Sequence, residues 1–520
     1  MLLTAILIAI LAGLLSLEYL GPQFGFSAPL IAGTIIGLIL GDVRTALPIA
    51  ATIQMAFMGI VAIGGAIPPD TLMAGVVGVS VAILTKTGVE GAMAIALPAA
   101  LFAQQTEILL NTVCISLAHR ADKYAAEGNL RGVERMHLLG LPLYFLERAI
   151  PTFLVVYFGV GPVKAVLAAL PDWLTKGLSI AGGLLPAVGF ALLLNVILSH
   201  KNLGYFMVGF AIMAYLKLPI LGAAIIGLGL VLILDQLRAA LQGSQASAEV
   251  QPASEAVGAT QGGKVTRKDL IAVFWRQMLL QGSINFERLQ GLGYAYTFAP
   301  VLKRLYPDKE AMAVALTRHM QFFNTTPPLA APILGVNAAL EEQSGNEADE
   351  AVRGIKAGMM GPLAGIGDSI LWFTVLPIAL GIGSMLAKEG SIVGPVLALI
   401  IINAVIIPLR YYGLFVGYRR GLNLVMDVSR GALARVTDGA MALGAFVAGA
   451  LISSLVVIKT PLAFGDFKIQ GALDGILPGL LPLAATLICL ALVKKRVKTV
   501  VLVIAALIVA IALGAVGVLG

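Results

Sequence analysis

Three acidic residues each stand alone in a long uncharged stretch of the sequence. Asp70, Glu107 and Asp368 are the only charged residues in stretches longer than the roughly 20 residues that a membrane-spanning helix needs. Because an ionisable side chain inside a membrane is costly, each of them predicts a functional site. The alternative is that each carboxylate caps the N-terminus of a half-helix or pairs with a Lys or Arg.

Asp70 directly follows two prolines, Pro68 and Pro69. Two consecutive prolines remove two backbone donors, so this segment predicts a helix break that lines a cavity or packs against protein. A second pair, Pro327-Pro328, follows about half a chain length later. Matching interruptions are typical of membrane proteins built from two related halves, with a site between broken helices. A chance coincidence of two such pairs among 25 prolines is the alternative.

Polar or flexible residues also surround the other two acids. Glu107 ends the run AQQTE, in which Gln104 and Gln105 precede it, and Gln104 shares a helix face with Glu107. Asp368 follows Gly367 in the run GMMGPLAGIGDS. A backbone this rich in glycine predicts a close approach to a ligand or a sharp turn within the protein.

These side chains suit a neutral polyol. A carboxylate can accept hydrogen bonds from two adjacent hydroxyls, and an amide both donates and accepts, so a sugar is a chemically sensible cargo. Gln54 and Asn324, which lie near the two proline pairs, fit the same role, with an interhelical hydrogen bond as the alternative. The sequence has no HExxH, GxSxG or Cys-His cluster, so we predict no catalytic residue, no metal site and no cofactor.

The elements that must position these residues are predicted to be membrane helices. Hydrophobic residues make up 59% of the 520 residues and charged residues only 12%, whereas soluble domains carry about 25% charged residues. We predict an all-α polytopic membrane protein with roughly ten to fourteen embedded segments, some of them re-entrant. The clearest spans are residues 1–17, 177–199, 390–409, 439–458, 475–493 and 499–520.

The net charge of +7 does not indicate nucleic acid, because the basic residues form short clusters beside apolar runs, as cytoplasmic loops do. Residues 242–263 are rich in Gly, Ala, Ser and Gln and have no apolar periodicity, so they predict a flexible linker. We therefore divide the chain into membrane domains at residues 1–241 and 264–520.

Several longer motifs resemble the membrane subunits IIC and IID of the mannose/fructose/sorbose family of the bacterial phosphoenolpyruvate-dependent sugar phosphotransferase system. The run GLILGDVRTALPIAATIQMAFMGIVAIGGAIPPD, residues 37–70, resembles IIC. Four runs in the second half resemble IID: VFWRQMLLQGSINFERLQGLGYAY, RHMQFFNTTPPLAAPILGV, MMGPLAGIGDSI and RYYGLFVGYRRG. These subunits are normally separate polypeptides, so the chain resembles a IIC–IID fusion.

The resemblance implies a multi-pass protein of the bacterial inner membrane that binds a hexose and moves it inward. Its expected partners are membrane lipid, further copies in a homotrimer, and a cytoplasmic IIB subunit that is charged by IIA and carries the phosphoryl group. The polar stretch 120–137 is expected to be a loop and a candidate docking surface for IIB, although a merely solvated loop fits equally well. Whether the chain counts as an enzyme is left open, since the phosphoryl-carrying residues would lie on other chains.

Carried over motif by motif, the resemblance places the sugar-binding residues mainly in the first half, and residues that shape or gate the cavity mainly in the second. The alternative function is an ion-coupled secondary sugar transporter, in which the three lone acids would bind protons or sodium ions. The predicted substrate-binding residues are Gln54, Asp70, Gln104, Gln105 and Glu107, and the predicted cavity or gating residues are Pro69, Asn324, Gly367 and Asp368.

Overall fold

The computed structural model describes residues 1–61, 67–162, 171–218, 220–243, 264–421, 423–425, 434–464 and 467–519. In these residues the chain is helical, apart from loops and one hairpin of β1 (Ala463–Phe464) and β2 (Phe467–Lys468). The predicted helical class is therefore confirmed. The predicted linker lies outside the described residues, except for residues 242 and 243, which end the helix α11.

Seven of the described helices are long and apolar enough to cross a membrane, and one bent pair adds an eighth candidate. Five shorter apolar helices accompany them, so the chain is a multi-pass membrane protein. In chain order the helices are α1 (Leu2–Leu20), α2 (Pro29–Leu40), α3 (Val43–Ala56), α4 (Thr71–Thr85), α5 (Gly88–Ala126), α6 (Leu130–Leu138), α7 (Gly140–Leu154), η1 (Val155–Gly159), α9 (Asp172–Ile197), α10 (Leu203–Leu216), α11 (Ile220–Gly243), α12 (Arg267–Arg276), η2 (Gln277–Leu279), α13 (Gly291–Leu305), α14 (Lys309–His319), η3 (Pro327–Leu329), α15 (Ala330–Ser344), η4 (Gly345–Ala348), α16 (Asp349–Gly367), η5 (Asp368–Val375), α17 (Leu376–Lys388), α18 (Val393–Arg420), α20 (Ala434–Leu455), α21 (Ile469–Ile476), α22 (Leu480–Lys494) and α23 (Thr499–Ala515).

Two local predictions were wrong. The span predicted at residues 475–493 is broken, because α21 ends at Ile476 and α22 begins at Leu480, at an angle of 77°. Pro478 cannot donate to a helix and Gly479 has a φ of +78°, so the chain turns between the two helices. The predicted loop at residues 120–137 is mostly helical, since it forms the end of α5 and most of α6.

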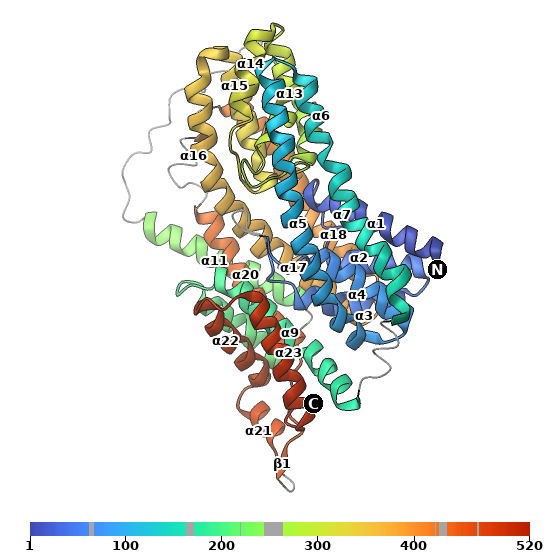
Figure 1. Cartoon of the computed structure of the whole chain (residues 1–520). Coiled ribbons are helices and arrows are strands. Elements are labelled where there is room, and N and C mark those ends of the chain that lie inside the picture. The colour runs from blue at the N-terminus through green and yellow to red at the C-terminus, as the bar shows by residue number, and fades with distance from the viewer. Residues whose placement is uncertain are drawn as a thin grey trace.

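The two halves of the chain interleave and do not form separate bodies. Figure 1 shows α5 and α6 of the first half beside α13, α14 and α15 of the second in the upper lobe. In the lower part, α9 and α10 of the first half pack against α20, α22 and α23 of the second. The largest hydrophobic core accordingly contains residues from both halves, such as Phe206 and Phe446.

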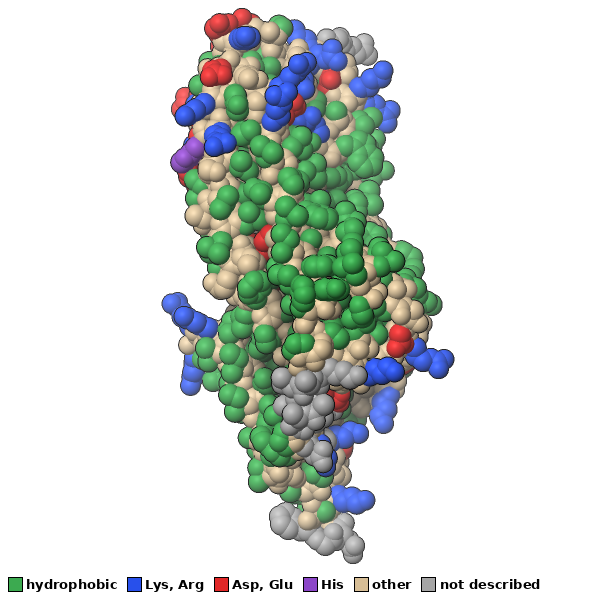
Figure 2. Space-filling model, turned by 45° about the vertical axis from the view of Figure 1, so that its right-hand side comes forward, with side chains coloured by type: hydrophobic (Ala, Val, Ile, Leu, Met, Phe, Trp, Pro, Cys, Tyr) green, Lys and Arg blue, Asp and Glu red, His purple; other side chains and the backbone are tan. Residues whose placement is uncertain are grey.

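Charge divides this surface into zones. Figure 2 shows many Lys, Arg, Asp and Glu side chains on the upper lobe and, beneath it, a broad region where hydrophobic side chains dominate. Exposed apolar side chains on α1, α5 and α18 belong to long apolar helices, as expected for a surface that contacts lipid.

Candidate functional site

One cavity of about 480 Å³ lies between the two halves of the chain. That volume falls within the roughly 300–1,000 Å³ that is usual for small-molecule sites. All three lone acids, Asp70, Glu107 and Asp368, line it. Of the other predicted site residues, the cavity lining includes Gln54, Pro69 and Asn324, but not Gln104, Gln105 or Gly367.

Both proline pairs reach this cavity. Pro68 and Pro69 lie in an extended segment before α4, and Pro327 begins the short helix η3. Neither segment belongs to an uninterrupted long helix, as the prolines predicted. The cavity is therefore built where the chain breaks its helices, and each half contributes one break.

The first break is fastened to α5 by two hydrogen bonds. The Asp70 N–H donates to the Ala100 carbonyl at 3.0 Å, and Gln104 Nε2 donates to the Ile67 carbonyl at 2.5 Å. Gln104 thus satisfies a carbonyl that the neighbouring prolines leave without a helical partner. Gln105 is exposed on α5.

Asp70 and Glu107 share one buried guanidinium. Arg148 Nη2 lies 2.5 Å from Asp70 Oδ2 and 2.7 Å from Glu107 Oε2, and Asp70 Oδ1 accepts from the Met73 N–H at 2.6 Å. Asp70 therefore caps α4 and also pairs with arginine, which is the structural alternative considered from the sequence. Glu107 uses only Oε2 for Arg148, so its Oε1 is the oxygen able to accept from a ligand.

A third carboxylate, Glu147, also pairs with Arg148 and accepts from the Thr106 hydroxyl. The cluster thus sets three acids against one base, and every one of these charged side chains is largely buried. Removing one partner from such a cluster leaves a buried charge uncompensated. Arg148 was not among the predicted site residues, although it is a basic residue within the apolar run LPLYFLERAIPTFL.

The opposite wall comes from α16 and η5. Thr326 Oγ1 donates to Asp368 Oδ1 at 2.6 Å, and Gly367 packs so closely that a Cβ would lie 2.6 Å from Thr326. Gly367 therefore allows a close contact between two segments of the protein, whereas the close approach to a ligand stays a prediction. The sharp turn given as the other possibility is not formed. Instead the helix continues through a π-helical stretch that begins at Asp368, and such stretches often occur at functional sites.

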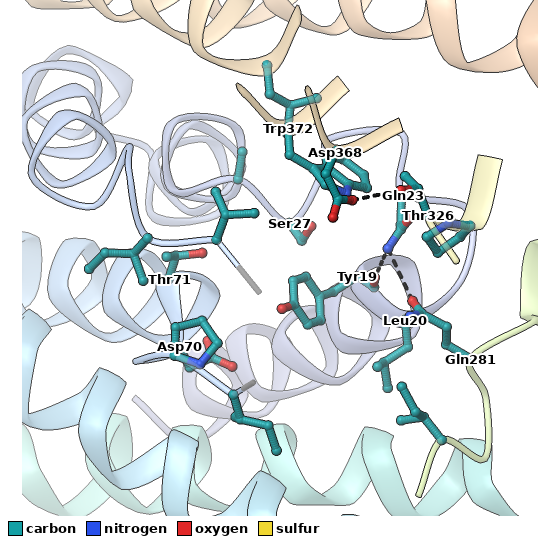
Figure 3. A pocket seen from close by; sticks show the side chains of 18 of the residues that line it. Tyr19, Leu20, Gln23, Ser27, Asp70, Thr71, Gln281, Thr326, Asp368 and Trp372 are labelled. Carbon is teal, nitrogen blue, oxygen red and sulfur yellow. Dashed lines mark hydrogen bonds between the residues drawn. The ribbon is translucent and has the colours of Figure 1, made fainter. Parts of the chain in front are cut away.

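The cavity is also lined by polar side chains that were not predicted from the sequence. Figure 3 shows Tyr19 between Asp70 and Asp368, and Gln23 donating to Gln281 at 3.2 Å. Asn111 follows Glu107 by four residues, so helical spacing alone could have found it. Tyr19, Gln23 and Gln281 gave no such signal, because they come from the end of α1 and from loops.

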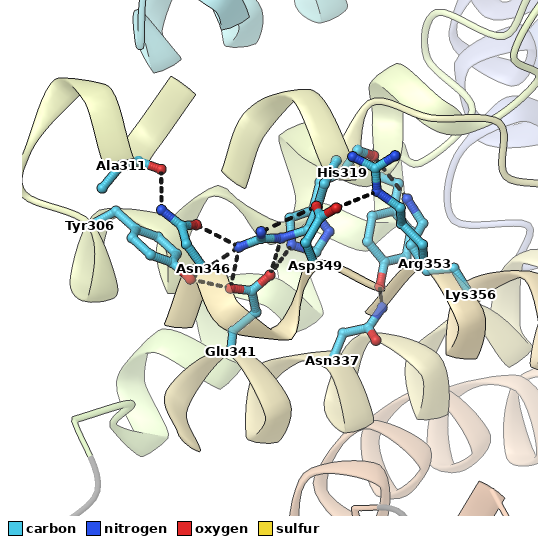
Figure 4. A network of polar contacts seen from close by, with 11 residues as sticks. Tyr306, Ala311, His319, Asn337, Glu341, Asn346, Asp349, Arg353 and Lys356 are labelled. Carbon is cyan, nitrogen blue, oxygen red and sulfur yellow. Dashed lines mark hydrogen bonds and ion pairs between the residues drawn. The ribbon is translucent and has the colours of Figure 1, made fainter. Parts of the chain in front are cut away.

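A second cluster, made of buried polar and charged side chains, lies in the upper lobe and links the helices α14, α15 and α16 (Figure 4). Arg318 donates from Nε and Nη2 to the two oxygens of Glu341 at 2.7 and 2.8 Å, and His319 Nε2 lies 2.8 Å from Glu341 Oε1. Lys356 on α16 donates to the His319 carbonyl at 3.0 Å. The cluster thereby joins α14 and α15, which precede and follow the segment carrying Asn324, to α16, the helix that leads to Asp368.

Comparison with known proteins identifies the two halves. Residues 264–519 match the family model for the PTS system mannose/fructose/sorbose family IID component, and residues 2–233 match that for the PTS system sorbose-specific IIC component. The mannose-specific EIID component of Escherichia coli (strain K12) is 43% identical over 271 residues, which are 49% of this chain and 96% of that protein. The chain belongs to the mannose/fructose/sorbose family of the phosphotransferase system.

The first half supports the same assignment. It is 31% identical over 233 residues to the mannose-specific EIIC component of E. coli (strain K12), covering 45% of this chain and 88% of that protein. The two family-model matches and these two relatives show that the protein is a IIC and a IID component of a sugar transporter of this family, joined in one chain, as the resemblance predicted.

Among solved structures, the chain is similar to one chain of the complex of the mannose transporter ManYZ with microcin E492. The two are 43% identical, with a TM-score of 0.30, over 50% of this chain and all of that one.

The Arg148 cluster predicts a specific pattern of stabilities. Arg148→Met should lower the free energy of unfolding by roughly 3–5 kcal/mol, because Asp70 and Glu107 then face each other without a cation. Adding Glu107→Gln should restore part of the loss, since one of the buried charges is removed. Thermal unfolding of the purified protein in detergent measures both effects, with Arg131→Met, at an exposed position on α6, as the control. Equal stability of Arg148→Met and the wild type would contradict the assigned role.

The polar cluster of the upper lobe predicts that the stability of the protein depends on pH. Burial lowers the pKa of His319 to about 4, from its usual value of about 6.5. As the pH falls from about 6.5 towards 4, the unfolded chain therefore binds a proton that the folded protein does not, and the protein loses stability. In His319→Gln, where an amide can still donate to Glu341, this loss should be smaller. Unfolding midpoints at pH 7 and pH 5 test this, and identical pH dependence in both proteins would refute it.

Proposed function

We propose that this chain binds a hexose in the cavity between its IIC and IID halves and carries it inward for phosphorylation. The observation that carries the proposal is the convergence of Asp70, Glu107 and Asp368, from both halves, on one cavity of about 480 Å³. The matched relatives support a hexose as the substrate class, since they include mannose-specific, sorbose-specific and fructose permease components.

The proposed sugar contacts follow from which polar atoms remain available. Glu107 Oε1 accepts from sugar hydroxyls, and Gln54, whose Oε1 already accepts from the Leu30 N–H at 3.3 Å, donates from Nε2. Asn324 adds an amide from the opposite half. Asp70 acts mainly through position, because both of its oxygens are engaged.

Neither Gln104 nor Gln105 lines the cavity in this conformation. We propose that they contact the sugar in another conformation of the transport cycle. Pro69, Gly367 and Asp368 are proposed to shape or gate the cavity. Pro69 keeps the segment before α4 from becoming helical, and the contact of Gly367 and Asp368 with Thr326 joins the two IID segments at the wall.

The proposed reaction needs other chains. A cytoplasmic IIB subunit, charged by IIA, would supply the phosphoryl group, and this chain would supply the path and the sugar site. We further propose that three copies assemble as a homotrimer in the lipid bilayer, and that the two halves are related repeats, an arrangement with which the two proline breaks at the cavity agree.

Reconstitution in vesicles tests the function. Labelled hexose should enter and appear as sugar phosphate only when phosphorylated IIB and IIA are supplied inside. Uptake driven by a proton or sodium gradient alone, with no sugar phosphate formed, would instead establish the ion-coupled alternative.

Glu107→Gln should reduce hexose uptake at least about tenfold, because the substitution removes a charged acceptor from the cavity wall. Thr112→Ala, at an exposed position on the same helix, serves as the control, and Gln105→Ala tests the second proposed contact. Normal uptake by Glu107→Gln would remove Glu107 from the site. If Gln105→Ala alone lost uptake, Gln105 would be a contact that forms in another conformation.

Asp368→Ala should lower turnover more than it lowers hexose affinity, since the proposed role of Asp368 lies in gating. Binding by calorimetry and turnover in vesicles separate the two quantities. A variant with unchanged turnover would contradict the gating role, and one with lost binding and normal insertion would make Asp368 a sugar contact.

A further inference from the structure

The loop between α1 and α2, residues 21–28, forms part of the cavity wall. Gln23, Gly25 and Ser27 from this loop line the cavity. Gln23 has a φ of +57° and Gly25 a φ of +94°. A non-glycine residue adopts such a left-handed φ only when its surroundings hold it there.

The IIC half holds the loop from one side. Glu18, in the last turn of α1, accepts the Gly25 N–H at Oε1 at 3.0 Å and the Ser27 N–H at Oε2 at 2.8 Å. Both carboxylate oxygens are thus used to fold the loop back over the end of its own helix.

The IID half holds the loop from the other side through α18. Asn403 Nδ2 donates to the Phe24 carbonyl at 2.9 Å, and Arg410 Nη2 donates to the Gly21 carbonyl at 3.4 Å. The Ile402 side chain packs under Gly25 so closely that a Cβ on that glycine would lie 2.9 Å from it. Contacts spaced along one IID helix therefore fix most of this IIC loop.

Arg410 is an unusual residue to find in such a place. It is fully buried, and it forms no ion pair within 4.0 Å with any of the described residues. Its Nη1 lies 2.8 Å from the Met278 sulfur, and its Nε has no hydrogen-bond partner. Glu18 is close enough to interact with it electrostatically. A buried cation so weakly paired costs stability, and the backbone acceptor that it does contact is the Gly21 carbonyl of the loop.

We propose that Asn403 and Arg410 are positioning residues for the hexose site, which hold the IIC loop in the conformation that presents Gln23 and Ser27 to the cavity. The proposal rests on the proposed function, because the loop matters for activity only if the cavity binds the sugar. On this reading the IID half determines the shape of a wall that the IIC half supplies.

The loop can be tested without any sugar. In a background lacking the two native cysteines, Cys114 and Cys489, the pair Gln23→Cys and Gln281→Cys should be joined efficiently by a short thiol-specific cross-linker, because the native side chains are in contact. Arg410→Met should lower the cross-linking yield at least about threefold. Arg410→Lys, which keeps the charge, should recover part of it, and Arg419→Met, at an exposed position on α18, should not change it.

Hexose binding is measured in parallel with the cysteine-pair substitutions absent. Arg410→Met should weaken hexose binding by about tenfold, as expected if the loop then adopts the binding conformation in only about a tenth of the molecules, and KM should rise more than kcat falls. If Arg410→Met does not insert, Asn403→Leu, which removes only a neutral amide, carries the same test with a smaller expected loss.

The outcomes separate the two proposals. Unchanged cross-linking and unchanged binding in the inserted variant would overturn the positioning role, and so would weakened binding with unchanged cross-linking. Reduced cross-linking in the variant, together with no hexose binding by the wild type, would keep the loop assignment and refute the proposed function.

Discussion

The site depends on one buried arginine. Arg148 on α7 holds Asp70, which caps α4, and Glu107, which lies in the middle of α5, so a single guanidinium joins three helices at the cavity wall. Without that cation, Asp70 and Glu107 would face each other in a largely apolar interior with no basic partner between them. The same pairing helps to determine which oxygens remain for a ligand. Arg148 engages one oxygen of Asp70 and one of Glu107, and the Met73 N–H engages the second oxygen of Asp70, so one oxygen of Glu107 remains.

Much of the site could be predicted from charge alone. A lone acid in an apolar stretch is conspicuous, and all three such acids reached the same cavity. The partners could not be predicted in the same way, because Arg148 is adjacent to Glu147 in the sequence and looks like half of a local ion pair. Tyr19 and Gln23 could not be predicted for another reason, since the end of α1 and the loop after it reach the cavity wall only in the folded chain.

The fold, like the site, could be predicted only in part from the sequence. The lengths of the apolar stretches predicted the membrane helices. They did not predict the break at Pro478 and Gly479, because backbone conformation and not hydrophobicity determines where that helix is interrupted. The arrangement of the two halves was not predictable, because lipid-facing and protein-facing apolar surfaces have the same composition. Only the structure shows that α10 packs on α20 and α5 on α14, across the two family-model halves.

This interleaving gives a physical reason why joining the two components in one chain is advantageous. Gln54 and Glu107 come from the IIC half and Asn324 and Asp368 from the IID half, so neither half alone encloses the cavity. A covalent link makes their association intramolecular, which raises the concentration at which each half meets the other. It also fixes the stoichiometry at one IIC to one IID. Since the loop at residues 21–28 relies on α18 for its shape, a IIC half that lacked its partner would lose part of the wall as well as the contacts across it.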